Sequence, residues 1–484
     1  MRAAPDALAF MRAYGRRGSL WEDDNMGEQL TILDTMFLEL EQVDETAHMH
    51  IGAALIFDPL PGGGVPDIDD LREFMGARIG LLPRFAQQLS SPSAGPLTWL
   101  TWEPAPDFDI SAHLRHATLP APGGEPELLE WLGDFWSHRL DRHRPLWEIV
   151  LVDGLEHGRW AMATKTHHCL VDGVGALDLG KVLLDETPDA PPVPEQAVEP
   201  VHGENGGGRS WFSPGIAIRG ARAGLSALTH PRDSIEKIVA AAEVIVKEEI
   251  IAAPASSLNR PTSGTRHYAT VRLSLEDVNA TRARFGGTIN DMVLALCAGG
   301  IRHLLESRGE EVQGVLRAQV PVNVRTADGR DLGNEITSLF VELPVGEPDT
   351  LRRYRRVVDN AERLKAGSQG AGGSTIAKIA DLAPPLAGEL LARSMFGTTR
   401  MFNLTITNVP GPPDKRYAFG APLVELLPLV PLFTGHTVGI AAVSYAGQMV
   451  FGINADRVAA PDVAVLAEGI EQTFAELSAP VAAD

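Results

Sequence analysis

The sequence predicts an α/β (α+β) protein made of two similar-sized domains that a partly helical linker joins. In both halves, apolar residues alternate over short runs, as in strands, and return every three or four residues elsewhere, as in helices. A stretch rich in proline, glycine and acidic residues begins near residue 188 and marks the clearest boundary. Of the 484 residues, 44% are apolar and 22% are charged, which excludes a disordered, collagen-like or coiled-coil chain.

The first domain is expected over residues 26–185. Alternating apolar residues predict strands at residues 48–58 (HMHIGAALIFD) and 159–168 (RWAMATKTHH). Residues 127–140 (ELLEWLGDFWSHRL) carry apolar side chains at helical spacing and predict a helix. Residues 1–25 contain arginines but lack the apolar segment of a secretory signal, so we expect a disordered extension there.

The linker is expected over residues 186–264 and the second domain over residues 265–484. Within the linker, residues 234–251 predict an amphipathic helix. The second domain begins with HYATVRLSLEDV, which predicts a strand that leads into a helix. It continues with the strand-like runs VLRAQVPVNVR, EITSLFVELPV, MFNLTITNVPG, HTVGIAAVSYAG and QMVFGINAD.

Charge and cysteine content narrow the classes of function. Lys and Arg number 42 against 63 Asp and Glu, and the net charge of −21 argues against a protein that coats nucleic acid. The only cysteines, Cys169 and Cys297, cannot form a disulfide framework, so we expect a reducing cytoplasm. The uncharged run at residues 426–445 is interrupted by prolines and glycines, which favours buried strands over a membrane-spanning helix.

The sharpest chemical feature is THHCLVDG, residues 166–173, between a predicted strand and a predicted helix. A neutral imidazole takes a proton from a hydroxyl near pH 7, which makes a rigidly held loop histidine a candidate general base. Asp172 is suited to bonding backbone amides or an arginine, and Gly173 permits a backbone shape that other residues avoid. The simpler alternative is a pair of surface or core histidines without a chemical role.

Other chemistries lack their sequence patterns. The chain contains no HExxH and no Cys/His cluster at metal-ligand spacing, so no metal site is expected. The GxSxG, GxxxxGK[ST] and strand-bound GxGxxG patterns are also absent. Four arginines in LRRYRRVV, residues 351–358, recur at helical spacing, which favours a solvated helix face over a site for coenzyme A phosphates.

The segment HHCLVDG resembles the HHxxxDG motif of the acyl-CoA-dependent acyltransferase superfamily, which includes chloramphenicol acetyltransferase and the condensation domains of peptide synthetases. Other segments resemble, more narrowly, the bacterial wax ester synthase/diacylglycerol acyltransferase family. The similarity covers about residues 28–475, and the segments that carry it are LDTMFLELE, MHIGAALIFD, LDRHRPLWE, GGTINDMVLALCAGGIRHLL, PVNVR, LGNEITSLFVELP and TNVPGPP. Thr407 departs from the serine common in that family, which leaves the acceptor preference open.

This resemblance implies two chloramphenicol acetyltransferase-like domains with the active site in a tunnel between them. It implies transfer of a fatty acyl group from acyl-CoA to diacylglycerol, giving triacylglycerol, or to a long-chain alcohol, giving a wax ester. By the same analogy His168 is the general base, and His167, Asp172 and Gly173 complete the motif. Acyl-CoA is a substrate here, so no cofactor is expected.

The partners expected from this resemblance are fatty acyl-CoA, diacylglycerol or a long-chain alcohol, and no nucleic acid. Because these substrates are insoluble in water, we expect a cytoplasmic protein that binds the inner membrane or lipid droplets peripherally.

Two further segments are candidates for shaping the site. Asn290 and Asp291 stand at a predicted helix start, where Thr288 is placed to cap the helix. Capping is one interpretation of this pair, and the resemblance implies another, in which the pair shapes the far wall of the site. Core packing is favoured over substrate contact for a second set: Pro145, Leu146 and Trp147.

Two other functions share the HHxxxDG motif. A condensation domain would have to work in trans, because 484 residues leave no room for carrier modules. A non-catalytic lipid-binding protein on the same fold would be expected to lose the base, whereas His168 and Asp172 are present. Among acyltransferases, wax ester synthesis as the main activity is the alternative to triacylglycerol synthesis.

Overall fold

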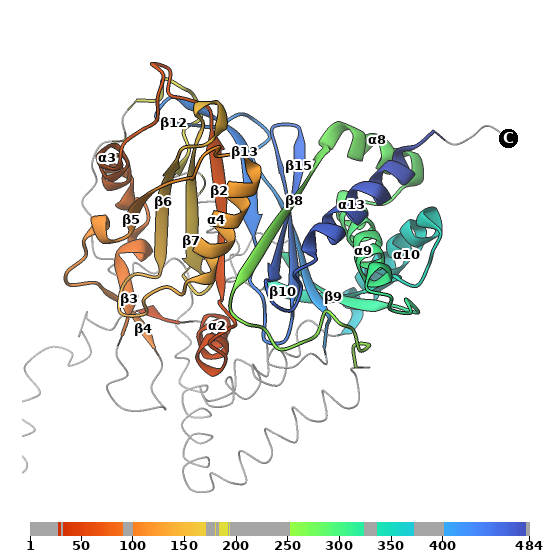
Figure 1. Cartoon of the computed structure of the whole chain (residues 1–484). Coiled ribbons are helices and arrows are strands. Elements are labelled where there is room, and N and C mark those ends of the chain that lie inside the picture. Colours follow the sequence, from red (N-terminus) through yellow and green to blue (C-terminus); the bar gives the residue numbers. More distant parts are fainter. Residues whose placement is uncertain are drawn as a thin grey trace, which may run out of the picture.

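The protein consists of two halves that lie side by side, each built on a six-stranded mixed sheet (Figure 1). A small third sheet contains β1 (Glu28–Gln29), β4 (Thr101–Pro104) and β3 (Gln87–Leu89). The computed structural model describes residues 28–30, 32–90, 100–170, 180, 183–191, 193, 252–323, 336–371 and 401–480. The predicted extension at residues 1–25 and the predicted linker helix at residues 234–251 lie outside these ranges.

The first sheet has the strand order β12-β13-β2-β7-β6-β5. β2 pairs antiparallel with β13 and β7, and β7 pairs antiparallel with β6, whereas β5 and β6 pair in parallel. The predicted strands and helix of the first domain are confirmed within a few residues. The elements of this half are α2 (Ile32–Val43), β2 (His50–Phe57), α3 (Ile68–Ile79), β5 (Leu114–Thr118), α4 (Glu125–Ser137), β6 (Trp147–Asp153) and β7 (Trp160–His167).

Helices pack on both faces of the first sheet, which explains why its inner strands β6 and β7 are largely buried, whereas its edge strand β5 is mostly exposed. Because successive side chains point to opposite faces, Trp160 and Met162 of β7 pack on the side of α3. Ala161 and Ala163 of the same strand pack on the side of α4. β7 is therefore buried along its whole length and holds its last residue, His167, in a rigid frame.

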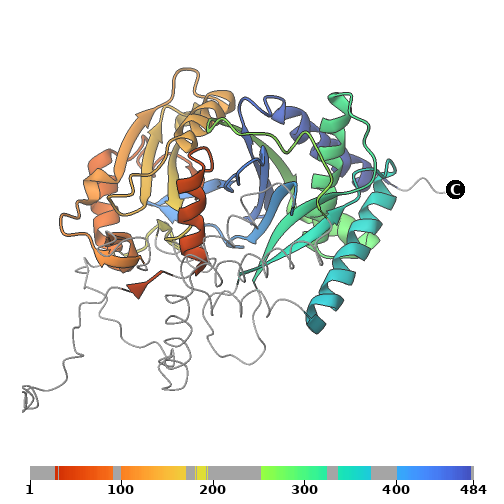
Figure 2. The same cartoon turned by 90° about the horizontal axis from the view of Figure 1, so that it is seen from below.

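The second sheet has the strand order β10-β9-β11-β14-β15-β8. Its helices cover the face turned away from the first half (Figures 1 and 2). The strands are β8 (Arg266–Ser274), β9 (Leu316–Asn323), β10 (Ile336–Leu343), β11 (Leu404–Pro410), β14 (Val438–Tyr445) and β15 (Gln448–Asp456). The helices are α8 (Leu275–Phe285), α9 (Ile289–Ser307), α10 (Thr350–Ala371) and α13 (Val463–Ser478).

The second half also supplies strands to the first sheet, which the sequence division does not predict. β12 (Tyr417–Ala418) and β13 (Ala421–Leu429) belong to the predicted C-terminal domain, residues 265–484, yet β13 pairs antiparallel with β2. A division of the chain by sequence order does not show such a crossing, because tertiary contacts decide which strands pair. β2 is thus hydrogen-bonded to β7 on one side and to β13 on the other.

The two sheets approach each other closely where β13 meets β8 and β15. The Tyr268 hydroxyl donates to the carbonyl of Pro428 at 2.6 Å, and the Asn454 side chain donates to the carbonyl of Val430 at 2.8 Å. A Cβ at Gly452 would lie 2.1 Å from the Pro428 oxygen, so only glycine fits at this point of contact. The same junction includes the ring of Trp136, 4.7 Å from that of Tyr268.

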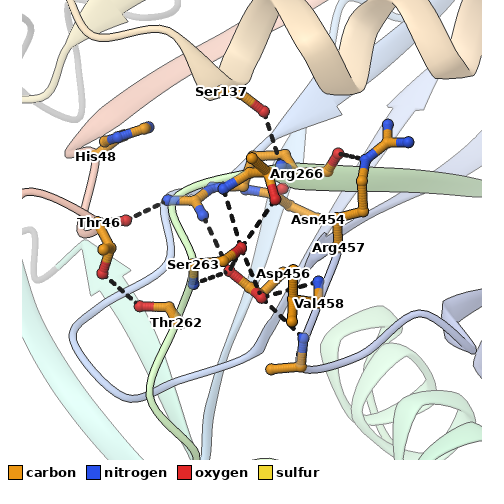
Figure 3. Close-up of polar contacts among 12 residues, drawn as sticks. Thr46, His48, Ser137, Thr262, Ser263, Arg266, Asn454, Asp456, Arg457 and Val458 are labelled. Atoms are coloured by element: carbon orange, nitrogen blue, oxygen red, sulfur yellow. Dashed lines mark hydrogen bonds and ion pairs between the residues drawn. The ribbon is translucent and has the colours of Figure 1, made fainter.

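A buried ion pair lies at the interface between the halves (Figure 3). Arg266 Nη1 lies 3.6 Å from Asp456 Oδ2, and both side chains are almost fully buried. Arg266 reaches the first half by donating from Nη2 to the carbonyl of Thr46 (2.6 Å) and from its backbone to the Ser137 hydroxyl (2.7 Å). Removing one partner of such a pair typically costs about 3–5 kcal/mol, so this cluster holds the halves in one relative position.

No helix in the described part of the chain is long and apolar enough to cross a membrane. The uncharged run at residues 426–445 contains the end of β13 and all of β14, as predicted.

The crossing of β13 predicts how the protein behaves when it is cut in the linker. Residues 26–200 alone lack β13, so the backbone groups of β2 that pair with it would be exposed as a sheet edge. We expect this fragment to be insoluble alone and soluble when it is co-expressed with residues 201–484. Soluble yield and size-exclusion chromatography measure this. A soluble, monomeric fragment with the strand content of the first sheet would contradict the prediction.

Candidate active site

The two histidines of the motif stand at the end of β7 and in the turn that follows. His167 lies opposite His50 of β2 in the strand register. Its backbone N–H donates to the carbonyl of Leu146 at 2.9 Å, and the N–H of His168 donates to the carbonyl of Met49 at 2.8 Å. A turn hydrogen bond from the Leu170 N–H to the His167 carbonyl closes the segment. The backbone of the histidine pair is therefore fixed by neighbours on both sides.

The side chain of His167 points into a buried cluster around Glu41 of α2. His167 Nε2 lies 3.6 Å from Glu41 Oε2, and His50 Nε2 lies 3.4 Å from Glu41 Oε1. Arg139 Nη2, from the loop after α4, lies 3.4 Å from Glu41 Oε2. On its other side, His167 Nδ1 accepts a hydrogen bond from the Cys169 N–H at 3.1 Å.

Burial and contacts act in opposite directions on this cluster. Burial by itself raises the pKa of the Glu41 carboxyl, but its contacts with His167 and His50 outweigh that effect and bring the pKa below its ordinary value. Burial lowers the pKa of His50 to about 3, which keeps that imidazole neutral at pH 7. Glu41 is therefore a carboxylate held among imidazoles, with Arg139 as its formal counter-charge.

His168 has a different environment. Its ring stacks on Phe37 of α2, with 4.2 Å between centroids and an interplanar angle of 22°. Burial lowers the pKa of His168 to about 4, so the imidazole is neutral at pH 7 and has a free lone pair for a proton. The general-base role that the resemblance implies for His168 stays a prediction.

The remaining motif residues and the cysteines contribute less. Asp172 and Gly173 lie outside the described residues. Cys169 and Cys297 are both free and buried, and burial raises the pKa of each thiol well above its ordinary value. Neither cysteine is therefore a reactive thiolate. Among the described residues, no group of His, Cys, Asp and Glu side chains has an arrangement that holds a metal ion.

Asn290 and Asp291 lie in the first turn of α9. The Asp291 carboxylate accepts from the Thr288 N–H and hydroxyl, each at 2.8 Å, and the Asp291 N–H donates to the Thr288 hydroxyl at 3.2 Å. This arrangement confirms the predicted helix cap. α9 covers the outer face of the second sheet (Figure 1), and the side-chain hydrogen bonds of Asp291 among the described residues are to Thr288 in the same helix cap. The role of the pair in shaping the site stays a prediction.

Pro145, Leu146 and Trp147 stand where the chain enters β6, beside β7. Leu146 and Trp147 are buried in the core, and the carbonyl of Leu146 supports His167. Trp147 donates from Nε1 to the carbonyl of Phe85 at 2.7 Å. This segment therefore packs the core, as the sequence favours, and also holds the backbone of the histidine strand.

A cavity of about 490 Å³ opens next to this segment, between α4 and β5. Its lining includes Pro145, Trp147, Arg115, Arg139 and Glu148. Among the described residues that line it, neither motif histidine is present, and each arginine of the lining lies within 4 Å of a carboxylate.

Comparison with known proteins places these features in a family. The model of the wax ester synthase/diacylglycerol acyltransferase catalytic domain matches residues 30–293, and that of the family's C-terminal domain matches residues 332–478. The chain belongs to the wax ester synthase/diacylglycerol acyltransferase family. The predicted resemblance is thus confirmed, and with it membership of a family of acyltransferases.

Relatives and solved structures agree with this assignment. A probable diacylglycerol O-acyltransferase of Mycobacterium tuberculosis is 32% identical over 462 residues, covering 93% of this chain and 96% of the relative. The structure of the wax ester synthase/diacylglycerol acyltransferase from Marinobacter aquaeolei is similar with a TM-score of 0.68 at 26% identity, covering 93% of this chain and 98% of that one.

A more distant structure bears on the fold alone. The first condensation domain of the calcium-dependent antibiotic synthetase matches with a TM-score of 0.59 at 17% identity, covering 95% of this chain and 98% of that one. The two-domain fold predicted from the resemblance, similar to condensation domains and chloramphenicol acetyltransferase, is confirmed.

Sequence reasoning missed the residues that surround the motif in this member of the family. Phe37, Glu41 and His50 lie in segments that were used only as marks of resemblance, and Arg139 was not singled out. One signal was present: Glu41 is a charged residue on a helix whose neighbours Leu38 and Leu40 belong to the core. A carboxylate on an apolar helix face requires a buried partner, which was a reason to look for one.

The buried histidines predict that the stability of this acyltransferase-family protein falls in mild acid. Burial lowers the pKa of three of them, His48, His168 and His436, to about 4 and that of His50 to about 3. The unfolded chain takes up protons on these groups below about pH 6.5, whereas the folded chain does not until about pH 4. We therefore expect the urea unfolding midpoint to fall between about pH 7 and about pH 5.

The overall charge of −21 is a second property that makes the unfolding midpoint depend on pH. High salt screens that charge but leaves buried groups almost unaffected, so the fall is expected to persist in high salt. A midpoint that is constant or rises toward pH 5 would contradict the prediction.

Proposed function

We propose that this protein transfers a fatty acyl group from acyl-CoA to the free hydroxyl of diacylglycerol and so makes triacylglycerol. The observation that carries the reaction is His168, a neutral imidazole fixed in a turn at the end of a buried strand. The relatives that are named diacylglycerol O-acyltransferases support diacylglycerol as the acceptor. A long-chain alcohol, which would give a wax ester, is the alternative acceptor in this family.

The proposed reaction is direct. His168 removes the hydroxyl proton of the acceptor while the oxygen attacks the thioester carbonyl, and the resulting tetrahedral intermediate expels the coenzyme A thiolate. The proton held on His168 then passes to the thiolate, which leaves as a thiol and returns the imidazole to its neutral form. No acyl-enzyme is required, and the raised thiol pKa of Cys169 is consistent with that.

An assay of purified protein tests both the base and the acceptor. Labelled palmitoyl-CoA is supplied with diacylglycerol or with hexadecanol, and kcat/KM is compared for wild type and His168→Ala. We expect diacylglycerol to be the faster acceptor and His168→Ala to lower the rate with either acceptor by about 10² to 10⁴, the usual contribution of a general base.

His116→Ala is the matched control, since His116 is an exposed histidine of the same sheet, paired with Asp153. It is expected to leave the rate unchanged. If His168→Ala keeps near wild-type turnover with an unchanged circular dichroism spectrum, the base is wrongly assigned. If hexadecanol is the faster acceptor, the protein is mainly a wax ester synthase.

We also propose that the protein binds lipid surfaces reversibly, because its acceptor and its product are insoluble in water. The net charge of −21 is repelled by anionic lipid, so the contact is expected to be apolar. In flotation with a triolein emulsion, we expect the protein to rise with the lipid at low and at high salt. Protein that stays at the bottom of the gradient, or that high salt releases from the emulsion, would contradict this.

A further inference from the structure

We propose that Glu41 is a positioning residue: its buried carboxylate holds His167 as the Nε2–H tautomer, and His167 in turn fixes the turn that carries His168. The inference deepens the proposed function, since it rests on His168 as the base. It assigns a task to the first histidine of the motif, which the reaction itself does not use.

The carboxylate of Glu41 is enclosed by three nitrogen-bearing side chains. Its side chain is only 1% exposed, and the nitrogens of His50, His167 and Arg139 lie 3.4–3.6 Å from its oxygens. Arg139 Nη2 also donates to the backbone carbonyl of Glu41 at 3.1 Å, which ties the loop after α4 to the end of α2. A carboxylate buried this deeply needs donors on every side.

The position of the proton on His167 follows from its two neighbours. The Cys169 N–H donates to His167 Nδ1, so Nδ1 must carry a lone pair and not a proton. The proton of the neutral ring is then on Nε2, the nitrogen that faces Glu41. A carboxylate attracts an N–H and repels a lone pair, so the charge of Glu41 favours the same tautomer that the turn requires.

Loss of that carboxylate would release the ring. With Nδ1 protonated, two N–H groups would face each other where His167 now accepts from Cys169, and the hydrogen bond inside the turn would be lost. His168 lies between these two residues in the chain. Its backbone is held from outside by the Met49 carbonyl, and the turn is held internally by two hydrogen bonds, from the Cys169 N–H to His167 Nδ1 and from the Leu170 N–H to the His167 carbonyl.

The same helix also fixes the ring of the base. Phe37, which stacks on His168, stands four residues before Glu41 on α2, and residues at that spacing share one helix face. One face of α2 therefore contacts both motif histidines, with an apolar ring against the base and a carboxylate against its neighbour.

The test is Glu41→Gln in the full-length protein, which keeps the shape of the side chain and removes its charge. With palmitoyl-CoA and diacylglycerol, we expect kcat to fall by about 10- to 100-fold, as for a misplaced catalytic group, with KM for palmitoyl-CoA within about twofold of wild type. The matched control is Glu148→Gln, since Glu148 is also a carboxylate paired with a cation, Lys165, and its ion pairs among the described residues do not include His167. The control is expected to keep kcat near the wild-type value.

A second measurement reads the tautomer directly. In protein labelled with ¹⁵N-histidine, the His167 ring, identified by its absence in His167→Asn, should show Nε2–H in wild type and a mixture of tautomers in Glu41→Gln. A wild-type Nδ1–H tautomer overturns the proposal without any variant. So does a kcat of Glu41→Gln that equals wild type, or a kcat that falls while the tautomer is unchanged.

Failure of this proposal is distinguishable from failure of the proposed function. If His168→Ala keeps its activity, the base is wrong, yet the His167 tautomer still reports whether Glu41 orients the turn. If Glu41→Gln fails to fold, the wild-type spectrum alone decides between the two tautomers.

Discussion

The double pairing of β2 fixes both the interface and the site. On one side β2 holds β7 in a register that places His50 opposite His167, and on the other it pairs with β13 from the second half. A strand that is hydrogen-bonded on both sides, in a sheet that is covered on both faces, cannot slip by one residue without turning its apolar side chains to the wrong face. The position of the histidine turn is therefore set by the same register that joins the two halves.

Buried charged groups lie at two places, the interface between the halves and the histidine turn, where the relative position of the elements matters most. Arg266 and Asp456 lie at the interface, and burial lowers the pKa of Arg266 to about 10, which still leaves it charged at neutral pH. Glu41 lies beside the histidine turn. Burying such groups costs free energy unless each is paired, so only arrangements that bring the partners together are stable. The two clusters therefore select one docking of the halves and one conformation of the turn.

Much of the fold followed from local patterns, whereas its long-range pairings did not. Alternation predicted β2 and β7, helical spacing predicted α4, and Thr288 with Asp291 predicted the start of α9, because each depends on residues close in sequence. The crossing of β13 depends on a partner that is hundreds of residues away. The motif singled out His168 as a candidate base, which stays a prediction, whereas Glu41 was found only from its distances to His167, His50 and Arg139, which no spacing in the sequence encodes.

The contrast between the two motif histidines explains why a pair is useful to an acyltransferase. A carboxylate beside the base would accept from the N–H of its imidazole and raise the pKa of that ring. Phe37 instead stacks on His168 and leaves its ring neutral, which suits a base that works next to apolar substrates. In our proposal, the charge that orients the turn belongs to Glu41, which lies against His167, one residue before the base. In the proposed reaction, orientation and proton transfer are assigned to neighbouring side chains that point into different surroundings.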